Sequence, residues 1–320
     1  MSIAKIEDQQ PFDFNGRDFL TLADFSKEEI EYFILLGIDL KEKLKKGVPF
    51  KPLAGKTLGM IFEKSSTRTR VSFEVGMVQL GGYPLFLSKQ DIQLGRGETI
   101  ADTARVLSRY VDGIMMRTDS QQKLIEMARY STIPIINGLS DLFHPTQAIA
   151  DFMTIYEHKK KWQGLKLVYI GDGNNVAHSL MITGTKLGMD VVVASPKGYE
   201  PNAKVIQLAK EEANRHGGKL EVINDPQVAV IGADIIYTDV WTSMGQEQET
   251  RLRLEHFKGF QVNSQLLKAA EKDHLFMHCL PAHRGEEVTD EVIEGPNSVV
   301  FDEAENRLHA HKAILTAFIR

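Results

Sequence analysis

Short apolar runs alternate with longer segments of helical periodicity along most of the chain, and this alternation constrains the fold more than any other feature. Nine runs are expected to be strands: residues 56–62, 83–87, 112–117 and 133–138 in the first half, and 165–172, 190–195, 219–224, 233–239 and 275–281 in the second. Strands that alternate with helices favour parallel sheets, because each connection must cross over the sheet. The predicted fold class is therefore α/β, with two open parallel-sheet domains.

The length of 320 residues favours two domains over one. We expect a first domain over 1–150 and a second over 151–302, joined by a helix over 145–162. The last segment, 303–319, has an amphipathic helical pattern. From its pattern alone, this helix could pack on either half.

Composition limits the classes of function that the chain can have. Hydrophobic residues make up 42% and the net charge at pH 7 is −5, so no global basic field indicates a nucleic-acid or anionic-membrane partner. No segment approaches the roughly 20 apolar residues of a membrane span. The single cysteine, Cys279, excludes an intramolecular disulfide and fits a reducing compartment, and the N-terminal segment lacks a signal-peptide core. We therefore expect a cytoplasmic protein.

Polar residues that directly follow strands are the candidates for a site, because open parallel sheets bind ligands beyond the carboxyl ends of their strands. Residues 65–70, with the sequence SSTRTR, follow a predicted strand and begin a helical segment. Amides at a helix N-terminus attract anions, and Arg68 or Arg70 can add a guanidinium fork that matches phosphate or carboxylate. The alternative is a capped helix with solvated arginines. The pattern is not that of a nucleotide P-loop.

Three further residues of the first half, Arg117, His144 and Gln147, follow strands in the same way. Alone, each has an ordinary interpretation as a surface arginine or a local hydrogen-bonding residue. Together they indicate a pocket for an anion and a carbonyl group, because they share one topological position with the SSTRTR segment. Gln93 lies in a glycine-rich loop, which by itself is most simply a turn.

The second half begins with a glycine turn after a strand, YIGDGNNVAHS over 169–179. The dinucleotide fingerprint fails because Val176 stands where the third glycine is required, so NAD is only weakly indicated. Asn174 and Asn175 instead offer amides that suit a carboxylate.

A later strand ends at Asp239, and Ser243 and Met244 follow it. A carboxylate at this position can bind an ammonium group, and a buried methionine can line the aliphatic part of a ligand. Taken alone, an aspartate that caps a helix and a methionine in the core are the simpler interpretations.

Cys279 lies beside His278 in the last predicted strand. Neighbouring residues of a strand point to opposite faces, which argues against a Cys–His nucleophile pair. A zinc site is not indicated either, because there is one thiol and the ten histidines do not form the usual spaced pairs.

Five stretches, in this order, resemble the aspartate/ornithine carbamoyltransferase family over nearly the whole chain: STRTR, HPTQ, DVWTSMG, HCLPAHRGEEVTDEV and FDEAENRLHAHKAIL. Each motif alone is modest, but five in order at suitable spacing are highly specific. The resemblance implies that domain 1–150 binds carbamoyl phosphate and that the C-terminal helix, about 303–320, packs back on it. It also implies that domain 151–302 binds ornithine.

The resemblance implies a role for each candidate residue. The carbamoyl phosphate ligands would be Ser66, Thr67, Arg68, Thr69, Gln93, Arg117, His144, Gln147, Cys279, Leu280 and Arg307, and the ornithine ligands Asn175, Asp239, Ser243 and Met244. The residues implied to act in catalysis are Arg68, Arg117, His144, Gln147, Asp239 and Cys279. In the family, the loop that carries Gln93 often serves the site of a neighbouring subunit, which implies a homotrimer or a multiple of trimers.

Intact SMG and HCLP motifs imply the ornithine-using branch of the family rather than the aspartate-using one. The implied reaction transfers the carbamoyl group from carbamoyl phosphate to the δ-amine of L-ornithine, giving L-citrulline and phosphate. It passes through a tetrahedral intermediate with no covalent enzyme intermediate, and it requires no metal or organic cofactor. Putrescine or another amine is an alternative acceptor. A non-catalytic binding protein or a nucleotide-dependent enzyme is an alternative of another class.

Overall fold

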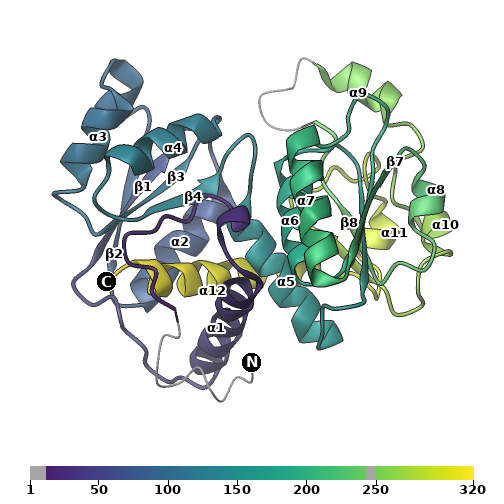
Figure 1. Cartoon of the computed structure of the whole chain (residues 1–320), viewed down its shortest axis with the longest axis horizontal. Coiled ribbons are helices and arrows are strands. Elements are labelled where there is room, and N and C mark those ends of the chain that lie inside the picture. Colours follow the sequence, from purple (N-terminus) through teal and green to yellow (C-terminus); the bar gives the residue numbers. More distant parts are fainter. Residues whose placement is uncertain (1–11, 243–248) are drawn as a thin grey trace. The chain divides into compact units, whose positions relative to one another are not determined.

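The computed structural model describes residues 12–242 and 249–320, which form two compact units. Unit 1 takes in the described residues up to Met153 together with Glu305–Arg320, and unit 2 runs from Thr154 to Ala304. Two helices, α5 (Pro145–Lys159) and α12 (Val300–Phe318), have residues in both units (Figure 1). The α/β class is confirmed, with two parallel-sheet domains that helices connect. In the described ranges, no helix has the length and apolar character that crossing a membrane requires.

Unit 1 is built on a four-stranded parallel sheet in the order β2-β1-β3-β4 (Figure 1). Its elements before α5 are η2 (Leu22–Asp24), α1 (Lys27–Lys45), β1 (Thr57–Phe62), α2 (Thr67–Gln79), β2 (Tyr83–Ser88), η3 (Gln93–Arg96), α3 (Ile100–Leu107), β3 (Gly113–Arg117), α4 (Gln121–Tyr130) and β4 (Ile135–Leu139). Helices α3 and α4 lie side by side, and their apolar residues pack on alternate residues of β1 and β3, such as Ile61, Ile114 and Met116.

The C-terminal part of α12 packs against α1 and α2 of unit 1. His311 stacks on Phe73 of α2 with ring centroids 3.8 Å apart. Lys41 of α1 donates from Nζ to Asn306 Oδ1 at 2.7 Å. These contacts hold Arg307, which lies close to the end of the sequence, within unit 1.

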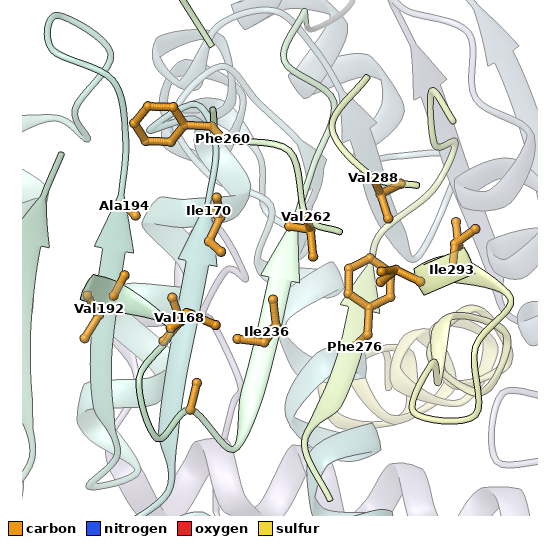
Figure 2. Packing of buried hydrophobic residues seen from close by; sticks show 14 of the residues in the cluster. Val168, Ile170, Val192, Ala194, Ile236, Phe260, Val262, Phe276, Val288 and Ile293 are labelled. Carbon is orange, nitrogen blue, oxygen red and sulfur yellow. The ribbon is translucent and has the colours of Figure 1, made fainter. Parts of the chain in front are cut away.

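Unit 2 is built on a five-stranded parallel sheet in the order β7-β6-β5-β8-β9 (Figure 1). Its elements after α5 are β5 (Lys166–Ile170), α6 (Asn175–Lys186), β6 (Asp190–Ala194), α7 (Ala203–His216), β7 (Lys219–Ile223), α8 (Pro226–Ala229), β8 (Ile235–Thr238), α9 (Thr250–His256), α10 (Ser264–Leu267), β9 (Leu275–His278) and α11 (Asp290–Ile293). Figure 2 shows one side of its core, where Val168, Ile236 and Phe276 from three strands meet Val262 and Ile293.

Both sheets contain a point at which the chain reverses its direction across the sheet. In unit 1, β1 lies between β2 and β3, and in unit 2, β5 lies between β6 and β8. In unit 1, the loops that follow the neighbouring strands β1 and β3 therefore begin at the same edge of the sheet, the edge formed by the carboxyl ends of its strands. In unit 2, the loops that follow β5 and β8 do the same. Open α/β sheets bind ligands at this position. Most of the residues singled out in the sequence follow these four strands or the neighbouring ends of β4 and β9, whereas Gln93 follows β2 and Arg307 lies on α12.

The start of α1 shows how local sequence begins a helix. Ser26 is the N-cap, and its Oγ accepts from Glu29 N at 3.2 Å while Ser26 N donates to Glu29 Oε2 at 2.8 Å. This reciprocal pair satisfies two amides that the helix itself leaves without acceptors. Ser120 holds the same N-cap position on α4, but its side chain makes no capping bond.

We predict that Ser26→Ala lowers the free energy of local opening at the start of α1 by about 1 kcal/mol, because the capping oxygen is lost. Amide hydrogen exchange measures this as roughly fivefold faster exchange in the first turns of α1. Ser120→Ala is the matched control, and exchange in α4 should stay within about twofold of wild type. Equal changes at the two helices would contradict the capping analysis.

Candidate functional site

The N-terminus of α2 presents amide and hydroxyl groups beyond the end of β1. Ser66 is the N-cap, and its Oγ accepts from Thr69 N at 3.2 Å. Within the described chain, the backbone N–H groups of Thr67 and Arg68 in the first turn have no protein acceptor. Free amides at the positive end of a helix dipole form a site for an anion.

The two arginines of the SSTRTR segment have different surroundings. Arg70 Nε pairs with Glu74 Oε1 at 2.9 Å, and the Arg70 guanidinium lies over the Phe86 ring, 3.6 Å from its centroid. Among the described residues, Arg68 forms no such ion pair, and its charge acts instead on His144. The structure therefore favours Arg68 as the cation for an anion at the helix start, and it assigns Arg70 to the surface of the fold.

Two buried guanidinium groups meet at the same helix start. Arg307 Nη2 donates to Thr69 Oγ1 at 3.0 Å, and Arg117 Nη1 lies 3.5 Å from the same oxygen. Arg307 is 3% exposed and Arg117 4%. Arg307 Nη1 also donates to Gln147 Oε1, while Gln147 Nε2 donates to Asp151 Oδ1 at 2.7 Å. The amide of Gln147 is thereby oriented with its oxygen toward the cations.

His144 lies directly before α5, where Pro145 begins the helix, and its side chain is buried. Burial, together with the guanidinium groups of Arg307 and Arg117, holds the pKa of His144 well below its usual range. The imidazole is therefore neutral at pH 7. It can donate or accept one hydrogen bond without adding a third positive charge to the cluster.

Glu63 is a residue of this region that the sequence reasoning missed. Its backbone N donates to Arg117 O at 2.9 Å, and its carboxylate accepts from Thr118 Oγ1 and, at 2.8 Å, from Lys123 Nζ. Burial opposes ionisation of Glu63, but Lys123 and Thr118 outweigh it, so the pKa of the carboxyl lies below its usual value. Glu63 therefore ties the end of β1 to the end of β3. Nothing in the sequence around Glu63 indicates that Lys123 and Thr118 are the partners of its carboxylate.

In unit 2, the turn after β5 is joined to the end of β8. Asn174 is the N-cap of α6, and its Oδ1 accepts from Val176 N and Ala177 N at 3.0 and 3.1 Å. The other half of the amide, Asn174 Nδ2, donates to Asp239 Oδ2 at 2.8 Å. The turn requires glycine at Gly173, because an added Cβ would lie 2.2 Å from Pro201 N.

Cys279 and Asp239 form the centre of the unit 2 group. Cys279 Sγ donates to Asp239 Oδ1 at 3.0 Å, and Asp239 is 7% exposed. The ring nitrogens of His278 are both engaged: Nε2 lies 3.1 Å from Glu287 Oε1, and Nδ1 accepts from Leu280 N at 2.9 Å. His278 thus cannot act as a base toward Cys279, although a ring nitrogen lies within 4.8 Å of the thiol and the Asp239 carboxylate. Leu280 has a φ of 56°, a strained backbone conformation that is common at binding sites.

A second ion pair of unit 2 supports the same turn. Arg253 Nη1 donates to Asp172 Oδ2 and to Trp241 O, both at 2.9 Å. Burial raises the pKa of Asp172, and Arg253 offsets only part of that rise. Arg253 therefore connects the loop that carries Asn174 with the chain that follows Asp239.

The structure brings together part of the predicted site. Thr69, Arg117, Gln147 and Arg307 are in direct contact in unit 1, and Asp239 and Cys279 are in contact in unit 2. Gln93 is exposed at the start of η3 and joins neither group within the chain. Asn175 begins α6, but the contact with Asp239 is made by its neighbour Asn174. Ser243 and Met244 lie outside the described residues.

The two groups differ in charge. The unit 1 group combines helix amides with two buried guanidinium groups and a neutral imidazole, so it favours an anion with a polarisable oxygen. The unit 2 group combines a carboxylate with an amide and a thiol, so it favours an ammonium or amine. One chain therefore carries sites for two ligands of opposite charge.

Comparison with known proteins identifies both halves of the chain. Residues 17–157 match the carbamoyl-P binding domain of aspartate/ornithine carbamoyltransferases, and residues 163–318 match the Asp/Orn binding domain of the same proteins. The ornithine carbamoyltransferase of Anoxybacillus flavithermus is 62% identical over 304 residues, which cover 95% of this chain and 97% of that protein.

Solved structures resemble this chain over nearly its whole length. The ornithine carbamoyltransferase of Pyrococcus furiosus superposes with a TM-score of 0.93 at 60% identity, covering 96% of this chain and 98% of that chain. The enzyme of the same name from Gloeobacter violaceus superposes with a TM-score of 0.85 at 47% identity, covering 95% and 98%.

We predict that the His144 imidazole is still mainly neutral at pH 6.5, where half of an ordinary histidine side chain is protonated, as nuclear magnetic resonance of labelled histidine would measure. Removing a cation with Arg307→Met should raise the pKa of His144, while burial still keeps it below the ordinary 6.5. In the unfolded chain the imidazole protonates near pH 6.5, so His144 lowers stability as pH falls below that value. A wild-type midpoint at or above 6.5 would contradict the buried, cation-flanked environment.

Proposed function

This chain belongs to the aspartate/ornithine carbamoyltransferase family, and we infer that it transfers the carbamoyl group of carbamoyl phosphate to the δ-amine of L-ornithine. The products are L-citrulline and phosphate. The observation that carries this inference is the identity of about 60% with several ornithine carbamoyltransferases along nearly the full length of both chains. The opposite charges of the two residue groups suit these two substrates.

Unit 1 residues are proposed to hold carbamoyl phosphate. The phosphate is bound by the helix start, with Ser66, Thr67, Arg68 and Thr69 as its ligands, and the free amides of Thr67 and Arg68 support this assignment. Arg117, His144, Gln147 and Arg307 surround the carbamoyl group and the bridging oxygen. Because His144 is neutral and Gln147 is oriented by Asp151, these two side chains can select hydrogen-bonding groups rather than charge.

Unit 2 residues are proposed to hold ornithine and to contact the reacting carbon. Asp239 pairs with an amine of ornithine, and Asn175, Ser243 and Met244 hold its amino-acid end. Cys279 and Leu280 contact the carbamoyl group. The contact between Cys279 and Asp239 supports a shared task in steering the attacking amine.

The proposed mechanism is direct acyl transfer. The neutral δ-amine attacks the carbonyl carbon and a C–N bond forms, which gives a tetrahedral intermediate. The C–O bond to phosphate then breaks, and the leaving phosphate takes up the proton that the amine nitrogen loses. The guanidinium groups of Arg68, Arg117 and Arg307 stabilise the charge that develops on the carbonyl oxygen and the leaving phosphate. Only about one amine in a few thousand is neutral at pH 7 if its pKa is near 10.4, so we expect the reaction at subsaturating ornithine to speed up as pH rises from 7 towards 9. The chemistry involves no change of oxidation state, and we propose that it needs no metal or organic cofactor.

We also propose that the enzyme is a cytoplasmic homotrimer or a multiple of trimers. The exposed position of Gln93 on η3 supports a role for this residue in the site of a neighbouring subunit. The sequence has one cysteine, Cys279, which excludes an intramolecular disulfide and supports a reducing compartment.

A steady-state comparison of ornithine with putrescine tests the proposed function. Putrescine lacks the carboxylate that the unit 2 residues are proposed to bind, so those polar groups would lose their partner. We predict that kcat/KM for putrescine is at least about a hundredfold lower than for ornithine. Equal efficiency with the two amines would overturn the assignment of ornithine as the specific acceptor.

The two arginines of the SSTRTR segment provide a matched pair of variants. We predict that Arg68→Ala lowers kcat/KM for carbamoyl phosphate by about a hundredfold or more, because a charge-stabilising donor is lost. Arg70→Ala removes only an exposed ion pair and a ring contact, so activity should remain within about threefold of wild type. An active Arg68→Ala enzyme would exclude the helix start as the phosphate site.

A mixing experiment tests the shared site. Gln93→Ala and Arg68→Ala should each be nearly inactive, since each lacks one proposed ligand of carbamoyl phosphate. After subunit exchange, sites that combine an intact Gln93 from one chain with an intact Arg68 from another should recover part of the activity, as a citrulline assay measures. No recovery after exchange verified by mass spectrometry would contradict sharing of the site.

A further inference from the structure

A cavity of about 200 Å³ lies in unit 1, away from the residue groups described above. It is lined by the last turns of α1, the segment after it, Gln79 at the end of α2, and Lys312 of α12. The proposed phosphate site lies at the opposite end of α2, a helix of 13 residues, and thus about 20 Å away at 1.5 Å per residue. We call this space the α1–α12 cavity.

The lining of the α1–α12 cavity is cationic on one part and apolar on another. Lys43, Lys51 and Lys312 contribute ammonium groups, and the described lining residues include no carboxylate. Leu40, Leu44, Val48 and Phe50 contribute hydrocarbon surface. In a chain with a net charge of −5, such a lining is a local exception that suits an anion with an apolar body.

Lys312 is the buried member of this set, with only 5% of its surface exposed. Its stem lies against Gly76 of α2, where an added Cβ would be 3.3 Å from Lys312 Cγ. No acceptor for its ammonium occurs in residues 12–242 or 249–320, whereas Lys43 pairs with Asp39 at 2.7 Å. Burial is also the one cause that lowers the pKa of Lys312, with no nearby carboxylate to offset it. Lys312 thus lines the cavity with a positive charge that has no counter-charge among the described residues, and a bound anion would supply one.

Gln79 supplies a second polar group without a partner. Its side-chain oxygen Oε1 is buried and has no donor in the described part of the chain. Gln79 and Lys312 line the same cavity from two different helices. A buried polar group of this kind requires an explanation, because such groups in folded proteins are nearly always hydrogen-bonded.

We propose that the α1–α12 cavity is a binding site for a small dicarboxylate with a short aliphatic body. One carboxylate pairs with the Lys312 ammonium, the other interacts with Lys43 or Lys51, and the hydrocarbon lies against Leu40 and Leu44. A water molecule held by the ligand donates to Gln79 Oε1. Since a water molecule occupies roughly 30 Å³, the cavity has room for a ligand of about the size of succinate.

The test follows methyl resonances of Leu40, Leu44 and Val48, which report on this cavity and not on the substrate sites. Succinate added to the wild-type protein should shift these resonances to saturation. Lys312→Met, which keeps the length of the side chain, should weaken binding by about tenfold or more, because a charge-assisted contact is lost. Lys46→Met is the matched control. Lys46 lies at the end of α1, which lines the cavity, but its own side chain is outside the cavity and pairs with Glu42. Its binding constant should stay within about twofold of wild type.

Two further compounds test which chemical class of ligand the α1–α12 cavity binds. Succinamide, the neutral diamide of the same skeleton, should not shift the methyl resonances, and inorganic phosphate should shift them more weakly than succinate. Tighter binding of phosphate would overturn the dicarboxylate assignment. The absence of saturable shifts with succinate, or a binding constant that Lys312→Met leaves unchanged, would overturn the site. The comparison of succinate with succinamide uses the wild-type protein, so this test of the site remains valid even if a variant folds poorly.

Discussion

Two guanidinium groups, those of Arg117 and Arg307, are buried against one threonine hydroxyl, and the unit 1 half of the site depends on this arrangement. Burying cations is costly unless they are hydrogen-bonded and eventually meet an anion. Thr69 and Gln147 supply neutral acceptors, and a bound phosphate group would supply the negative charge. A bound anion would therefore add to the stability of this cluster, which is a common origin of tight anion binding.

The rest of unit 1 keeps these cations in position. Arg117 lies at the end of β3, and its backbone carbonyl accepts a hydrogen bond from the backbone N–H of Glu63. The Glu63 carboxylate in turn accepts a hydrogen bond from Lys123. Arg307 is held by the packing of α12 on α1 and α2, through contacts such as the stacking of His311 on Phe73. The neutral state of His144 follows from the same cluster, since a third cation beside two guanidinium groups is disfavoured.

Unit 2 has the opposite electrostatic character. Asp239 accepts hydrogen bonds from a thiol and from an amide, and both donors are neutral, so its charge is not cancelled within the group. A carboxylate of this kind attracts an amine and can orient it for attack. The division of charge between the two units matches the division of labour in carbamoyl transfer, in which an anionic donor reacts with an amine acceptor.

Apolar periodicity in the sequence predicted nine strands, whose bounds agree with those of β1 to β9 to within three residues, and it placed most of the candidate residues after strands. These signals are local: apolar runs, helix caps and turns act between residues that are close in the chain. The pattern alone left open the choice between Arg68 and Arg70, and between Asn174 and Asn175, and the family resemblance named Arg68 and Asn175.

The tertiary structure adds contacts between distant residues that bear on both pairs. Arg70 is engaged by Glu74 of the same helix and by the Phe86 ring of β2, whereas Arg68 has no such ion pair among the described residues. Asn174 donates to Asp239, 65 residues away, and the role of Asn175 stays a prediction. The contact between Arg307 and Thr69 joins residues 238 positions apart, and no periodicity or cap encodes it. Such contacts arise when helices pack and desolvate their side chains, so they depend on the arrangement of the whole unit rather than on neighbouring residues.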